Sequence, residues 1–560
     1  MKTFFSNKHF QFWLGISLVL GLSIFWKTLD FPFLINYDDG PLIINNPAVL
    51  EFDISRMFSE FVFGLYHPIT TLSFAIDYLV FNGNFAAFHF VNISLHFLNG
   101  ILCYTLVLKL SNKKIVAGIS LLLFIIHPMH VESVVWLSER KDLLYSFFFL
   151  LACVTYIKSC EFKGFSKWSG ITFLLFVLAV LSKSAAVVFP LVIILIDLSK
   201  NQFKFPKRIL KVIPYLLVSI LIGYVNILAQ KSAGFITDMP NYSFLDRILM
   251  ACYSSVYYLL NFFVPINVSP KHFYPIMENG DLSPIYYVAP FLLLLSIFIA
   301  FKLVSKNRAF LFPIGFFILN IMLILKIIPT GNDIVSDRYS YLPYIGISMI
   351  VGLLVDRFYS SKTKNIFIGS GIIICLTLAF LSFSYTKVWE NETTLWTFVI
   401  NKNPNHRTGY GERGRNYHDN SNYKKALIDL NKALKLDSNS SINYNQRGLT
   451  YSAIQKPDKA FSDYSEAIFL DSNYAEAYSN RGVLLSKYDR TKEGILDINK
   501  AILLNPKDAD YYNNVGIAHA QLAQWKLAEY NFKKCLALHP RHSDAKFNLN
   551  RLNKMSNEKP

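Results

Sequence analysis

The feature that most constrains this chain is a series of long apolar runs in its first 385 residues. A helix needs about 20 apolar residues to cross a bilayer, with a range of roughly 17–25. Only 17% of all residues are charged, against about 25% in an average soluble domain. We therefore expect a polytopic membrane protein with about eleven spans, which excludes a single soluble domain and a disordered chain. The runs are 11–29, 86–108, 115–130, 142–158, 168–182, 185–199, 209–229, 285–304, 309–327, 341–356 and 365–385.

Lys and Arg residues gather on alternate connections between these runs. Connections rich in Lys and Arg usually stay in the cytoplasm, so the pattern predicts a cytoplasmic N-terminus and a C-terminal region on the opposite side. The stretch 248–264 is also apolar, but a further span there would break the alternation. We interpret it as a helix at the outer interface. The non-cytoplasmic connections are then 30–85, 128–141, 182–184, 230–284 and 328–340.

A repeat of 34 residues begins after residue 406. Glycines recur at 414, 448, 482 and 516, and a tyrosine stands four residues before each of them. Small residues that let two helices approach, repeated at this period, are typical of tetratricopeptide repeats, which stack into a solenoid and bind peptides or proteins. Residues 386–560 also hold 26 of the 55 Lys and Arg residues and half of the 38 acidic ones, as expected for a water-exposed module.

The predicted fold is therefore all-α and has two parts. A membrane helical bundle occupies residues 1–385 and carries two long outer loops, 30–85 and 230–284. A linker at 386–406 leads to four tetratricopeptide repeats at 407–542. A capping helix and tail follow at 543–560. The six cysteines form no CxxC pair, so a disulfide framework or zinc site is not expected.

Polar clusters with catalytic potential fall on the predicted outer side of the membrane. They contain Asp38 and Asp39; His127, His130 and Glu132; Arg140; Lys183; and Arg338. Carboxylates near the membrane plane are costly and often mark a functional site. Each cluster also has a structural interpretation: a turn for the Asp pair, a helix-end turn for the His-Pro segment, membrane anchors for Arg140 and Lys183, and a local pair for Asp337 and Arg338.

The order of these clusters resembles a known family. Tyr37-Asp38-Asp39, the His67–Thr70 segment, His127–Glu132, Ser182-Lys183 and Asp337-Arg338 with Tyr341-Leu342-Pro343, followed by the repeats, are similar to the transmembrane and tetratricopeptide repeat (TMTC) family of protein O-mannosyltransferases. More broadly, the chain resembles the GT-C glycosyltransferases. The resemblance covers roughly residues 10–542.

The resemblance implies transfer of a sugar from a polyprenyl-phosphate carrier, with inversion, to a Ser or Thr hydroxyl outside the cytoplasm. Asp38 or Asp39 would be the base, without a choice between them. Glu132, His130 and His127 would bind the acceptor or support the site. Arg338, Lys183 and Arg140 would offset charge on the lipid phosphate, because Arg and Lys both pair with phosphate.

Other functions stay open at this stage. A divalent metal could bind among Asp38, Asp39 and Glu132, although a metal-independent reaction is favoured and no cofactor is expected. The alternatives are a non-catalytic membrane scaffold for envelope assembly, and transfer to a lipid or glycan. The expected partners are the lipid-linked sugar, an acceptor protein held by the repeats, and the bilayer, with no nucleic acid. The predicted location is a bacterial inner membrane with periplasmic repeats.

Overall fold

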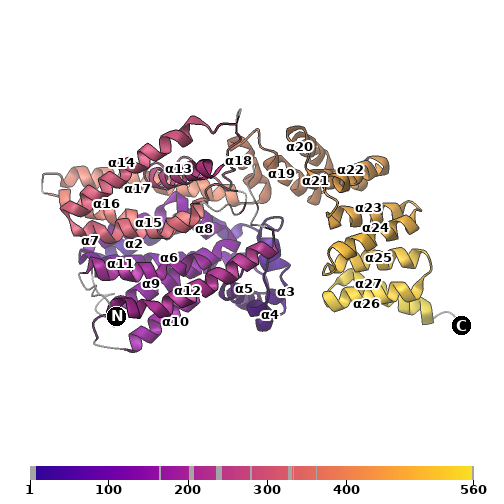
Figure 1. Cartoon of the computed structure of the whole chain (residues 1–560), viewed down its shortest axis with the longest axis horizontal. Coiled ribbons are helices and arrows are strands. Elements are labelled where there is room, and N and C mark those ends of the chain that lie inside the picture. Colours follow the sequence, from indigo (N-terminus) through magenta and orange to yellow (C-terminus); the bar gives the residue numbers. More distant parts are fainter. Residues whose placement is uncertain are drawn as a thin grey trace. The chain divides into compact units, whose positions relative to one another are not determined.

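The computed structural model describes residues 8–162, 166–200, 207–234, 242–277, 280–325, 331, 333–360 and 362–557. Residues 1–7, parts of the predicted loops 230–284 and 328–340, and the end of the predicted tail lie outside these ranges. The described residues form helices with two isolated β-bridges (Figure 1). The chain divides into two compact units, residues 1–395 and 396–560. The predicted all-α class is confirmed.

The first unit runs from α2 to η9. Its elements are α2 (Lys8–Phe25), η1 (Trp26–Asp30), η2 (Gly40–Ile44), α3 (Pro47–Leu50), α4 (Ile54–Ser59), α5 (Pro68–Phe81), α6 (Phe85–Ser111), α7 (Lys114–Ile126), η3 (Pro128–His130), α8 (Val131–Val135), η4 (Leu137–Glu139), α9 (Arg140–Ser159), α10 (Lys167–Ser182), η5 (Ser184–Val188), α11 (Phe189–Ser199), α12 (Lys207–Ser232), α13 (Phe244–Phe263), α14 (Pro284–Lys306), η6 (Arg308–Phe310), α15 (Leu311–Ile321), η7 (Met322–Ile324), η8 (Asp337–Ser340), α16 (Tyr344–Phe358), α17 (Lys364–Thr386) and η9 (Lys387–Trp389).

Six helical stretches of the described residues are long and apolar enough to cross a membrane: Lys8–Asp30, Phe85–Ser111, Leu137–Ser159, Ile209–Ser232, Pro284–Lys306 and Lys364–Trp389. A seventh arises if Lys114–Ile126 and Pro128–Val135, which meet at 59°, count as one. Four further apolar stretches are shorter: Pro68–Phe81, Lys167–Ser182, Ser184–Ser199 and Arg308–Ile324. The count of about eleven spans is therefore not confirmed and stays a prediction.

The core of this unit surrounds α7, which packs against α2, α6 and α16. Glycines make the close contacts possible: a Cβ at Gly118 would collide with Trp13, and one at Gly352 would meet Val116. The outer helix α14 instead exposes apolar side chains, including Phe291 and Phe301. Large apolar residues exposed along a helix of this length are expected where lipid replaces water.

The first outer connection folds into a compact layer. Leu42, Val49 and Met57 of the connection pack with Phe74 of α5 and Phe88 of α6 in one buried cluster. Residues Pro68–Phe81 of this connection form α5, which begins with Pro68 at its first position. Pro is favoured there because its missing N–H would have no helical partner.

The second unit is a stack of helix pairs. They are α19 (Arg407–Asp419), α20 (Tyr423–Leu436), α21 (Ser441–Ala453), α22 (Pro457–Leu470), α23 (Ala475–Lys487), α24 (Thr491–Leu504), α25 (Ala509–Gln521) and α26 (Trp525–Leu538), followed by α27 (Ser543–Asn557). The first helix of each pair packs on the second, and the second packs on the next pair. Figure 1 shows the successive pairs.

An ion-pair ladder follows the 34-residue period. Arg413, Arg447 and Arg481 each bind an aspartate sixteen residues later with two hydrogen bonds of 2.7–3.0 Å. The fourth repeat has Val515 and Asn531 at these positions. Each Arg also donates to a side chain sixteen residues earlier, which for Arg413 is Thr397 of α18 (Glu392–Lys402). The segment predicted as a linker therefore contains a helix whose second half joins the ladder.

Candidate active site

Asp39 is a buried carboxylate with a full set of partners. It follows α2 and η1 and is 1% exposed. Its oxygens accept from the backbone N–H of Leu34 at 2.9 Å and of Ser138 at 2.9 Å, and from the Ser138 hydroxyl. Burial raises the pKa of Asp39 to about 6, although these hydrogen bonds oppose the rise. Asp39 thus ties the first outer connection to η4.

Asp38 differs from its neighbour. Its carboxylate is half-buried and makes no hydrogen bond or ion pair with the part of the chain that the structure describes. It lies in the electrostatic field of Lys141, Glu139, Lys271 and Arg338. Burial raises the pKa of Asp38, and Lys141 is the strongest opposing influence. Of the two predicted bases, Asp38 is the one whose oxygens remain available.

Glu132 and Arg338 form the centre of a charged cluster. The Arg338 Nη1 lies 2.5 Å from Glu132 Oε1, and its Nε lies 3.2 Å from Glu139 Oε1. Burial alone would lower the pKa of Arg338, but Glu139 and Glu132 raise it well above its usual value. The guanidinium therefore stays charged.

Lys183 joins the same cluster from the break between α10 and η5. Its Nζ pairs with Asp142 and lies 3.7 Å from Glu139 Oε2. Lys141, which the sequence analysis did not single out, places its Nζ 2.9 Å from Glu139 Oε1. Glu139 is thus a fully buried carboxylate that forms ion pairs with three cations from different elements.

Arg140 lies apart from this cluster. It is 0% exposed and pairs with Asp77 of α5 at 2.5 Å. It also donates to Asn92 Oδ1 at 2.8 Å and to the Phe88 carbonyl at 3.0 Å, and its guanidinium faces the Phe74 ring. These contacts give Arg140 a structural role, which is to hold α5 against α6 and α9.

His127 and His130 are also used structurally. Both are 1% exposed. His127 Nδ1 accepts from the Met129 N–H at 3.2 Å and caps η3, while its Nε2 contacts the Phe262 carbonyl at 3.0 Å. His130 Nδ1 contacts the Phe124 carbonyl at 2.7 Å. This is the helix-end turn that was the alternative interpretation of the His-Pro segment.

The loop after α13 contributes a residue that no local sequence pattern singles out. Lys271 Nζ lies 3.1 Å from Asp333 Oδ2 and 5.4 Å from the centroid of the Tyr37 ring. Burial alone would lower the pKa of Lys271, but Tyr37 and Asp333 raise it. Nothing in the local sequence links these segments, because the contact depends on how distant loops fold together.

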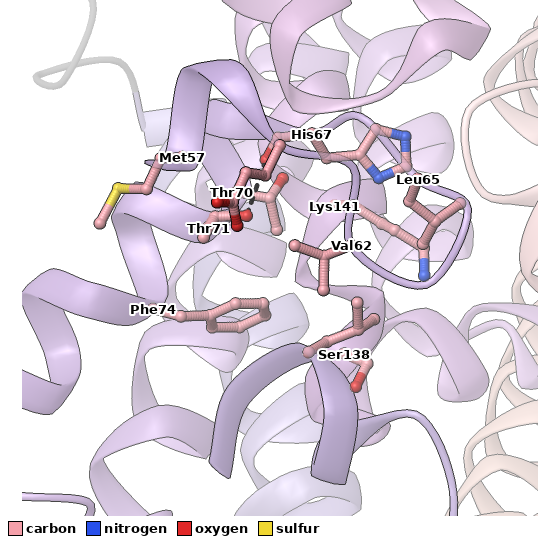
Figure 2. A pocket seen from close by; sticks show the side chains of 11 residues that line it. Met57, Val62, Leu65, His67, Thr70, Thr71, Phe74, Ser138 and Lys141 are labelled. Atoms are coloured by element: carbon pink, nitrogen blue, oxygen red, sulfur yellow. Dashed lines mark hydrogen bonds between the residues drawn. The ribbon is translucent and has the colours of Figure 1, made fainter. Parts of the chain in front are cut away.

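A small pocket adjoins the Asp39 anchor (Figure 2). Ser138 and Lys141 line it together with His67, Thr70 and Phe74. The remaining lining residues are mainly apolar: Leu42, Met57, Val62 and Leu65, with Glu60 and Thr71. Burial lowers the pKa of His67 to about 3, so its ring is neutral at pH 7. The pocket combines apolar walls with one cation and several hydroxyls.

The carboxylates do not assemble an oxygen cage for a metal. Glu132 is paired with Arg338, and Asp39 with Ser138. Within the described ranges, no group of three or more His, Cys, Asp or Glu residues is arranged to hold a metal ion.

Comparison with known proteins shows what the chain is similar to. A family model for the tetratricopeptide repeat matches residues 408–440. A Caenorhabditis elegans protein O-mannosyl-transferase is 24% identical over 434 residues, which are 72% of this chain and 59% of that protein. Human protein O-mannosyl-transferase TMTC3 is 22% identical over 478 residues, 74% of this chain and 50% of that protein.

The chain is similar to the TMTC proteins. A shorter match, 32% identical over 168 residues, joins 27% of the chain to 19% of human protein O-mannosyl-transferase TMTC2. The chain spans about half the length of the C. elegans protein and of human TMTC3. The resemblance read from the motifs is confirmed, as is the membrane character, which the apolar helices also support.

Proposed function

We propose that this chain is an integral-membrane glycosyltransferase. It moves a sugar, mannose in this proposal, from a polyprenyl-phosphate carrier to a Ser or Thr hydroxyl of a protein. The names of the TMTC relatives support the reaction class. The observation that carries the proposal for this chain is Asp38: a half-buried carboxylate free to accept a proton, in the field of Lys141, Lys271 and Arg338.

In the proposed reaction, Asp38 accepts the proton of the acceptor hydroxyl as the oxygen attacks the anomeric carbon. The bond between that carbon and the phosphate oxygen breaks, and the polyprenyl phosphate leaves with the electron pair. Attack opposite the leaving group inverts the anomeric carbon. General-base catalysis of this kind contributes about 10²–10⁴-fold.

Arg338, with Lys141 and Lys183, supplies positive charge for the departing phosphate. Preorganised charges lower the barrier most when water is excluded, and the Glu132–Arg338–Glu139 cluster is nearly buried. We leave Arg140 out of this role because Asp77, Asn92 and Phe88 already engage its guanidinium. The proposed reaction needs no metal, because these cations take the part that a metal would take.

The proposal also covers the membrane face on which the reaction occurs and the part of the chain that holds the acceptor protein. We place the reaction on the non-cytoplasmic face of a bacterial inner membrane, with a cytoplasmic N-terminus and periplasmic repeats. The repeats hold the acceptor protein, since concave repeat surfaces bind extended partners. Lys and Arg on alternate connections support the orientation.

The test is sugar transfer by the full chain in proteoliposomes. The donor is radiolabelled polyprenyl-phosphate mannose and a membrane extract supplies acceptors. Asp30→Asn is the matched control for Asp38→Asn, because Asp30 lies in the same connection and is exposed. We expect the wild type and Asp30→Asn to transfer label to protein and Asp38→Asn to fail. Absence of transfer by the wild type with several lipid-linked sugars would favour the scaffold, and label in lipid alone would favour a lipid acceptor.

A further inference from the structure

We propose that Glu392 is a positioning residue that fixes the loop carrying Asp38. The inference rests on the proposed function, because it assigns Glu392 to the same reaction. Glu392 lies more than 350 residues from that loop in the sequence, at the start of α18. It acts through Asn36, with which it makes two hydrogen bonds.

Glu392 contacts Asn36 through two hydrogen bonds, which together are called the grip below. Glu392 Oε1 accepts from the Asn36 backbone N–H at 2.7 Å, and Oε2 accepts from the Asn36 side-chain amide at 3.1 Å. The Glu392 side chain is 7% exposed. Hydrogen bonds to an ionised acceptor are about twice as strong as neutral ones, and two together also fix direction. Asn36 stands two residues before Asp38, so the grip restrains the backbone that leads directly to the proposed base.

The start of α18 is itself well fixed. The Asn391 side chain accepts from the Thr394 N–H at 3.0 Å and caps the helix. Just before it, Trp389 stacks on Trp136 with ring centroids 5.5 Å apart, and Trp136 stacks on Tyr37 at 4.5 Å. The segment 389–392 therefore holds the loop at Tyr37 as well as at Asn36.

A further restraint on the loop acts at Asp39, on the far side of Asp38. Asp39 is held by Leu34 and Ser138. The Asp38 carboxylate makes no hydrogen bond with the described residues, while its backbone carbonyl accepts from the Leu42 N–H at 3.1 Å. The position of the carboxylate therefore depends on the restraints on its backbone.

Glu392 acts beside the anchor at Asp39, the Tyr37 stack and the Tyr37 N–H, which donates to the Leu34 carbonyl at 3.0 Å. Its removal takes away the two hydrogen bonds at Asn36. A misplacement of about 1 Å at a reacting group can cost on the order of 10²-fold in rate.

The test compares Glu392→Ala, Glu392→Gln and Glu390→Gln in the full chain in proteoliposomes. Glu390 is exposed and lies two residues away, so its variant removes the same charge without touching Asn36. We expect kcat to fall about tenfold or more in Glu392→Ala and less in Glu392→Gln, whose amide oxygen still accepts one hydrogen bond. The Glu390→Gln rate should stay within about twofold of wild type, and KM for the lipid donor should change in none.

The acid limb of the pH–rate profile separates positioning from loss of folded protein. Burial raises the pKa of Asp38, while Lys141, Lys271 and Arg338 lower it and Glu139 raises it. A looser loop admits water to Asp38 and brings its pKa down towards the usual value. The acid limb of Glu392→Ala should therefore move to lower pH. A smaller folded fraction would lower the rate without moving this limb.

Hydrogen exchange gives a readout that does not need activity. The Asn36 amide should exchange faster in Glu392→Ala than in Glu390→Gln. Normal transfer and unchanged exchange in Glu392→Ala would overturn the inference. A lower rate with an unmoved acid limb would also overturn it and leave a purely structural role. If the wild type transfers no sugar, the proposed function fails, and unchanged exchange at Asn36 would then refute the grip separately.

Discussion

Replacement of Ser138 by Ala tests the account of Asp39 in the most detail. The Ser138 hydroxyl donates to Asp39, and two backbone N–H groups at 2.9 Å remain after its removal. A hydrogen bond to a buried charged group contributes about 1.5–3 kcal/mol. One pKa unit corresponds to about 1.4 kcal/mol. We therefore expect Ser138→Ala to raise the pKa of Asp39 from about 6 by about 1–2 units.

The pH dependence follows from the sign of this shift. The Asp39 pKa in the folded protein lies above its usual value of 3.8, so ionisation of Asp39 costs stability as the pH rises through about 6. Ser138→Ala enlarges that cost above pH 6, where Asp39 is ionised in the wild type. At pH 5 the carboxyl is mostly protonated in both proteins, so the loss of stability should be smaller there.

The assay is thermal unfolding of the full chain in nanodiscs at pH 5 and pH 8. Ser120→Ala is the matched control: Ser120 is also 0% exposed, but its hydroxyl donates to the Val116 carbonyl at 2.9 Å. Ser138→Ala should lower the midpoint more at pH 8 than at pH 5, and Ser120→Ala should lower it equally at both. An equal loss for Ser138→Ala at the two pH values would refute the assignment of an ionised Asp39 as its partner.

Two other predictions concern ion pairs, one in the membrane unit and one in the repeats. Arg140→Met should prevent accumulation of folded protein, because leaving Asp77 buried without its partner costs about 3–5 kcal/mol. Arg338→Lys keeps a cation beside the buried Glu132 and Glu139, so it should yield folded protein, but it should transfer less sugar because Lys lacks the two-point contact of Arg with phosphate. Gel-filtration recovery and transfer assays check both variants, and equal recovery of the two would contradict this distinction. Arg447→Met should remove one of the three ion pairs of the repeat ladder. It should lower the free energy of unfolding by about 1–2 kcal/mol, because the pair with Asp463 is partly exposed. Faster hydrogen exchange confined to α21 and α22 would support this prediction, and unchanged exchange would count against it.

Local patterns in the sequence were sufficient to predict much of the fold. The 34-residue spacing of Gly414, Gly448, Gly482 and Gly516 predicted the repeats because small residues are required where helices meet. The number of spans was less predictable, because 16 residues in α10 and 11 in α11 satisfy an apolar pattern without reaching the length of a straight span.

The site was predictable only where neighbouring residues carry the signal. Asp38, Asp39, Glu132 and Arg338 were selected from short clusters, and the structure brings Glu132 and Arg338 together. Arg140 has the same residue type as Arg338, but its contacts with Asp77 and Asn92 depend on the packing of α5 and α6. Lys271 and Glu392 reach the site from distant segments, and no local pattern marks such contacts.

The most direct test of the central claim is the initial rate of sugar transfer by Asp38→Asn beside Asp39→Asn. Both proteins should be compared at equal folded amounts, in proteoliposomes, at pH 7. If Asp38 is the base, its Asn variant should lose about 10²–10⁴-fold in kcat while KM for the lipid donor is kept. Asp39→Asn should retain more activity, because Asn still accepts at one oxygen from Ser138 or Leu34. Wild-type transfer by Asp38→Asn would contradict the account.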